Sequence, residues 1–97
     1  DDQEATAGKA VATAASTRVS QAVALQGKQM ISIEECSLGA GGLVVSFKYN
    51  FLGADGLYWV QGSAKVRGAE VADFKVAQMS PNLTAATTAK GVKLASN

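Results

Sequence analysis

The chain has 97 residues, a formal net charge of +1, 47% hydrophobic residues and 18% charged residues. This length fits one domain, and this composition is typical of a globular protein and not of a disordered segment. It contains no histidine, which excludes zinc sites and catalytic triads built on imidazole. One cysteine excludes an internal disulfide, and the nine Lys and Arg residues form no cluster, which argues against nucleic acid as the main partner.

The first residues and the composition bear on localisation. The chain starts with Asp1-Asp2-Gln3 and no methionine, which favours a secreted or periplasmic protein with its signal peptide removed; a trimmed recombinant chain would begin in the same way. The longest apolar runs, such as Leu43-Val44-Val45, are too short to span a membrane. Asn82-Leu83-Thr84 matches the N-glycosylation acceptor pattern, in a region expected to be a loop.

Residues 4–26 are predicted to form a helix. Val11, Ala15 and Val19 recur every four residues and form one narrow apolar face. Gly27 stands where a helix C-terminus commonly has glycine. Because the apolar side chains are small, we expect the helix to pack closely on a sheet and not to bury a ligand.

From Lys28 to Met79 the hydrophobic period changes from 3.6 residues to 2, which is typical of half-buried strands. A four-residue loop at 53–56 pairs Leu52 with Leu57, and the same register brings Phe47 opposite Gly62. Both apolar sets then share one face, as a correct register requires. The predicted strands are 29–38, 43–52, 57–67 and 71–80.

The turn after the third strand decides the register of the fourth. A three-residue loop, Gly68-Ala69-Glu70, pairs Arg67 with Val71 and directs Phe74 to the core. A two-residue loop would instead direct Asp73 and Lys75 inward, so the three-residue loop is preferred. It also sets Lys65 opposite Asp73 on the outer side.

Going back along the chain, the glycine-rich turn 39–42 pairs Leu38 with Leu43. A bulge at Glu34-Glu35 is needed to return Ile33 and Ile31 to the core side. After Pro81, residues 82–97 are expected to be irregular, with a short strand at 92–95 as one option. The predicted class is therefore α+β, with one N-terminal helix packed on a four-stranded antiparallel meander and an irregular C-terminal tail.

Three features that resemble chemical motifs have structural interpretations. Cys36 falls on the inward side and is expected to be a buried thiol, with an intermolecular disulfide as the alternative. Glu34 and Glu35 point to opposite faces of a strand, which argues for a solvated bulge and against a paired-carboxylate or metal site. The glycines at 39–42 join two strands, whereas phosphate-binding loops lead into a helix.

Trp59 is an exception to the alternation of the third strand, because it is a large apolar residue on the polar side. The expected register pairs it with Asn50 and sets it across from Met79, with Leu52 and Leu57 beside it. An apolar cluster on a polar face often marks a contact surface. Leu52, Leu57, Trp59 and Met79 are therefore the candidate binding residues, and coverage of Trp59 by the C-terminal tail is the alternative.

The order of a helix and then an antiparallel meander over residues 4–79 resembles the cystatin-like architecture and, more loosely, the globular heads of pilins. The cystatin hairpin motif Gln-x-Val-x-Gly would fall at 39–42, where this chain has Gly39-Ala40-Gly41-Gly42. The Pro-Trp of the second inhibitory hairpin is replaced by Gly68-Ala69-Glu70. The resemblance therefore implies a scaffold and not cysteine-protease inhibition.

These observations predict a secreted or periplasmic, non-enzymatic module that binds another protein through the apolar sheet corner and the hairpin loops. No metal or cofactor is expected. The alternative is a structural or assembly subunit, a homo-oligomer that self-associates through the open sheet edges. An enzyme would need a cofactor or a partner to supply the missing catalytic groups.

Overall fold

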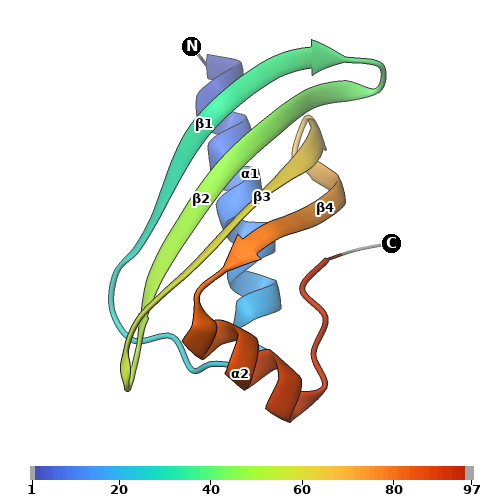
Figure 1. Cartoon of the computed structure of the whole chain (residues 1–97). Coiled ribbons are helices and arrows are strands. Elements are labelled where there is room, and N and C mark those ends of the chain that lie inside the picture. The colour runs from blue at the N-terminus through green and yellow to red at the C-terminus, as the bar shows by residue number, and fades with distance from the viewer. Residues whose placement is uncertain (1, 96–97) are drawn as a thin grey trace.

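The computed structural model describes residues 2–95, which form two helices and one antiparallel sheet (Figure 1). The elements are α1 (Asp2–Val19), β1 (Gln29–Gly39), β2 (Gly42–Gly53), β3 (Gly56–Arg67), β4 (Glu70–Met79) and α2 (Pro81–Lys90). The strand order β1-β2-β3-β4 makes the sheet a meander, and α1 packs against it and contacts every strand. The predicted α+β class and the order of helix and meander are confirmed.

Helix α1 is shorter than predicted, because it ends at Val19 and not at residue 26. Near its end the hydroxyl of Thr17 donates to the carbonyl four residues earlier, at 2.9 Å, and that of Ser20 donates to the carbonyl of Thr17, at 3.0 Å. Such bonds compete with the helical pattern. The backbone N–H of Gln26 then donates to a β2 carbonyl at 2.8 Å, so Gly27 (φ 84°) belongs to the loop before β1 and does not end the helix.

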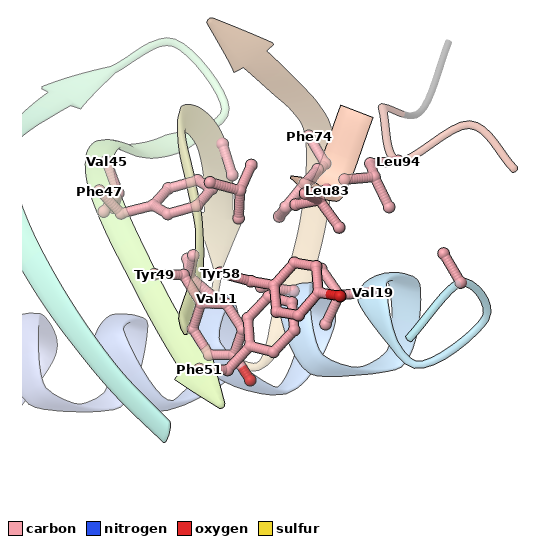
Figure 2. Packing of buried hydrophobic residues seen from close by; sticks show 14 of the residues in the cluster. Val11, Val19, Val45, Phe47, Tyr49, Phe51, Tyr58, Phe74, Leu83 and Leu94 are labelled. Atoms are coloured by element: carbon pink, nitrogen blue, oxygen red, sulfur yellow. The ribbon is translucent and has the colours of Figure 1, made fainter. Parts of the chain in front are cut away.

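The core lies between the face of the sheet that carries the aromatic residues, here called the inner face, and α1 (Figure 2). The rings of Phe47 and Phe74 lie 5.3 Å apart between centroids, and those of Phe51 and Tyr58 stack at 5.2 Å. A Cβ added at Gly8 of α1 would lie 3.7 Å from a side-chain carbon of Ile33. The small residues of α1 therefore allow the close packing on the sheet that the sequence predicted.

The predicted register of the first two hairpins is confirmed. Phe47 pairs with Gly62 across β2 and β3, and Leu38 pairs with Leu43 across β1 and β2. The ladder of β1 and β2 shifts between Ile33 and Glu35, as the expected bulge requires. Each of these two ladders has one more residue pair next to the turn than predicted, Gly39 with Gly42 and Gly53 with Gly56. The two loops therefore contain two residues each.

The third hairpin differs from the prediction. Its loop has two residues, because Arg67 pairs with Glu70 and not with Val71. Phe74 nevertheless points to the core, as predicted, because β4 has a bulge at Asp73. Asp73 has a left-handed backbone (φ 51°), and the bulge shifts the side chains that follow by one position. Phe74 is thus buried, and the Lys65–Asp73 ion pair still forms on the other face at 3.8 Å, both side chains being about half exposed.

The C-terminal segment is also corrected, because residues 81–90 form α2 and residues 92–95 form no strand. Pro81 occupies the start of the helix, where its missing N–H costs nothing. Gly91 ends the helix with φ 65°, and its N–H donates to the carbonyls of Thr87 and Thr88. The Ala- and Thr-rich composition concealed the helix, since Leu83 is the one large apolar residue within it.

We expect Leu83→Ala to lower the free energy of unfolding by about 2–5 kcal/mol, because the side chain is fully buried in the core that α1 and the sheet form. Thr84→Ala on the exposed side of the same turn should change it by less than about 1 kcal/mol. Urea denaturation of both variants measures the difference. Equal values would mean that α2 contributes nothing to the core.

Two core tyrosines make stability sensitive to alkaline pH. Burial raises the pKa of Tyr49, whose hydroxyl donates to Gln29, and the hydrogen bond to the Asp55 carboxylate raises the pKa of Tyr58. A folded-state pKa above the unfolded value favours the neutral phenol, so this stability is present below about pH 10 and is lost as the pH rises through the folded pKa. Denaturation curves above pH 10 should therefore show a smaller loss for the double variant Tyr49→Phe/Tyr58→Phe than for the wild type.

Candidate functional site

The face of the sheet opposite α1, here called the outer face, carries the predicted binding residues. Leu52 and Leu57 pair directly across β2 and β3 and are 44% and 58% exposed. Trp59 lies on the same face, paired with Asn50 and partly exposed. The structure thus brings together three of the four predicted residues.

Met79 does not belong to this group. It pairs with Val60, whose side chain is in the core, because the β3–β4 ladder shifts between Gln61 and Gly62. The shift turns Met79 to the inner face, where it lines a hollow of about 330 Å³ together with residues of α2 and of the segment after it. Within residues 2–95, α2 and the segment after it thus lie against Met79, while Trp59 is partly exposed on the other face.

A residue that the sequence analysis did not include takes the fourth place. Met30 pairs with Asn50 and is 67% exposed. With Leu52 and Leu57 it lines a groove of about 280 Å³. The signal for Met30 was present, since the bulge that returns Ile31 to the core also directs Met30 outward. Met30, Leu52, Leu57 and Trp59 are hereafter called the apolar corner.

The surroundings of Trp59 hold its backbone firmly. Its N–H donates to the hydroxyl of Ser80 at 3.1 Å, and its carbonyl accepts from the N–H of Ser80 at 2.9 Å. The ammonium group of Lys48 lies 5.1 Å from the centre of the indole ring. The carbonyl of Leu57 accepts from the side-chain amide of Asn82 at 2.9 Å. These contacts make the corner a preformed surface, so binding to it would cost little ordering of the backbone.

The rest of the outer face is polar. One row across the four strands consists of Glu35, Ser46, Ser63 and Lys75, so an exposed carboxylate and an exposed ammonium group stand at opposite edges with small residues between them. In the neighbouring region Gln61 donates to Glu34 at 2.9 Å. Glu34 thus lies on the outer face, at the solvated bulge that the sequence predicted.

The other motifs have structural settings of their own. Cys36 is free, partly buried and packed against the core, which makes it less enclosed than predicted. The loop at 40–41 is tied to β3 by Arg67, whose Nε donates to the carbonyl of Gly41 at 3.1 Å. The side-chain amide of Asn82 already donates to a β3 carbonyl from the first turn of α2, so the expected accessible loop for glycosylation is absent from the folded chain.

No family model, curated protein or solved structure matches the chain. Within residues 2–95, no three His, Cys, Asp or Glu side chains lie close enough together to hold a metal ion. Neither of the helices in that range has the length and apolar character that crossing a membrane requires.

Proposed function

We propose that this protein is a secreted or periplasmic, non-enzymatic module that binds another protein chain through the apolar corner. The observation that supports the proposal is the exposure of Met30, Leu52 and Leu57 beside Trp59 on one side of a rigid sheet. Burying such a cluster of exposed apolar side chains stabilises a complex by about 25 cal/mol for each Å² of apolar surface that leaves the solvent. Trp and Met are also residue types that protein interfaces favour.

The shape of the corner favours a protein partner over a small ligand. The groove beside Met30 is open to solvent, and most of the residues that line it belong to strands. Ligand pockets instead enclose most of the ligand's surface. A side chain or a short segment of another protein fits such a groove.

The alternative function, assembly through sheet edges, has the open strands β1 and β4 in its favour. Both strands carry bulges, β1 between Ile33 and Glu35 and β4 at two places, one of them the positive-φ residue Asp73. Bulges in edge strands interrupt pairing with a further strand. This observation favours the face of the sheet over its edges as the contact surface.

A photo-cross-linking experiment tests the proposed function. The variant Leu57→p-benzoylphenylalanine, illuminated in the native compartment, is expected to form covalent adducts with a protein chain. Leu38, which is 83% exposed at the opposite end of the sheet, provides the matched control position. Adducts should form from position 57 and not from position 38.

A second set of variants separates binding from folding. Trp59→Ala together with Leu52→Ser should abolish the adducts from position 57, and each change alone should lower the free energy of unfolding by no more than about 1 kcal/mol. Equal adduct yields from positions 57 and 38, or adducts that persist in the double variant, would contradict the proposed function.

A further inference from the structure

The outer face has a pattern that bears on the kind of partner. Its apolar residues lie at one end of the strands, while Glu35 and Lys75 occupy the two edges in one row nearer the middle. Among residues 2–95 no ion pair includes either of these side chains, and both are exposed. The row therefore has a negative charge at one edge and a positive charge at the other, and the apolar residues lie at one end of the face. The face also carries Lys48 and Lys65 on the two middle strands, and Asp73 of β4 forms an ion pair with Lys65.

We propose that the partner of the apolar corner is a second copy of this chain, packed outer face against outer face. This inference rests on the proposed function, because it names the partner of the same surface. The two-fold axis runs parallel to the strands, between β2 and β3 and midway between the two sheets. It brings β1 over β4 of the second copy and β2 over β3, each at the same height along the strands.

Rotation about this axis brings complementary residues of the two outer faces opposite each other. Glu35 comes over Lys75 of the second copy, and the symmetry repeats this pair on the other side of the axis. Leu52 comes over Leu57 of the second copy, and Trp59 comes over Asn50. The small side chains of Ser46 and Ser63 meet in the middle and leave room for close approach. Aligned packing of two sheets is a common arrangement in proteins.

An axis perpendicular to the strands fits less well. Placed at the middle of the sheet, it would bring the apolar end of one copy over the opposite end of the other, where Lys65 and Arg67 lie. The apolar corner would then face charged groups. Of these two axes, the one along the strands pairs Glu35 with Lys75 and also sets the apolar end of one copy over that of the other.

The size of the face indicates the class of interface that it can form. Four strands spaced by about 4.8 Å and about ten residues long at about 3.3 Å per residue give a face of roughly 600 Å². Contact over the whole face would remove on the order of 1,200 Å² from solvent, which is the lower limit for specific protein interfaces. We therefore expect a weak and reversible dimer, as is typical of interfaces at the low end of this size range.

Charge reversal tests the pairing directly. Sedimentation equilibrium of the wild type over about 1 µM to 1 mM should show a monomer–dimer equilibrium. Glu35→Lys alone and Lys75→Glu alone each put like charges in both pairs, and each should raise the dissociation constant about tenfold or more. Lys9→Glu on the exposed side of α1 is the control for the change in net charge and should leave the constant unchanged.

Mixing the two single variants gives the decisive result. In a heterodimer of Glu35→Lys with Lys75→Glu all four charges are again paired with opposite charges, so the mixture should dimerise as tightly as the wild type. The double variant in one chain should also regain the wild-type constant. A wild type that stays monomeric at 1 mM, or a dimer that is indifferent to both reversals, would overturn the inference.

The outcomes also separate this inference from the proposed function. If the wild type is monomeric while position 57 still cross-links to a different protein, self-recognition is wrong and the binding function is retained. If a charge-sensitive dimer forms and Trp59→Ala with Leu52→Ser does not weaken it, the apolar corner is not part of the contact. The inference is overturned in both cases, while the proposed function is tested separately by the adducts from position 57.

Discussion

Replacing Phe47 by alanine should remove a large part of the free energy of unfolding. The side chain is fully buried, it pairs with Gly62 in the ladder, and its ring lies 5.3 Å from that of Phe74. Removing such a ring costs about 3–5 kcal/mol, because the cavity that remains cannot be filled. A domain of this size has a total stability of only about 5–10 kcal/mol.

Thermal denaturation followed by circular dichroism measures this effect. Leu52→Ala on the same strand is the matched control, since Leu52 is 44% exposed on the outer face and its truncation should cost less than about 1 kcal/mol. An unchanged melting temperature for Phe47→Ala would mean that β2 does not direct Phe47 into the core.

The second large effect is expected from Gly62→Ala, a change of one methyl group. The backbone of β4 approaches β3 so closely at this point that a Cβ on Gly62 would lie 1.9 Å from the carbonyl oxygen of Lys75. The obstacle is main chain, so it cannot rotate away, and the strands must separate. We expect a loss of about 3 kcal/mol or more in the free energy of unfolding.

Gly27→Ala is the control for the backbone preference of glycine. Gly27 has φ 84° and no atom within 4 Å of an added Cβ, so its substitution should cost only about 1 kcal/mol. Urea denaturation of the two variants compares steric with conformational cost. Similar losses would show that β4 is free to move away from Gly62.

The close approach at Gly62 also positions the candidate surface. The register shift beside Gly62 turns Met79 to the inner face and brings Ser80 to the backbone of Trp59. The same irregularity that buries Met79 therefore holds Trp59 at the edge of the apolar corner. A variant that disturbs Gly62 is expected to change both stability and the outer face.

The sequence alone determined the class of the fold and most of the register. The alternation from Leu43 to Phe51 and from Tyr58 to Val66 has only one pairing that gathers both apolar sets on one face, so β2 and β3 were predictable pair by pair. The bulge at Glu34 was predictable for the same reason, because without it a carboxylate would enter the core. Leu52, Leu57 and Trp59 followed from this register.

Tertiary structure decided the rest. The bulges of β4 could not be predicted, since Asp73 adopts a left-handed backbone that only the burial of Phe74 requires, and no glycine marks the position. Helix α2 has weak periodicity and becomes stable by burying Leu83 against a core that already exists. The alternation of apolar residues determines the register of two strands when both apolar sets must lie on one face of the sheet. The side on which Met79 lies depends instead on the shift between β3 and β4, which only the packing of the strands decides.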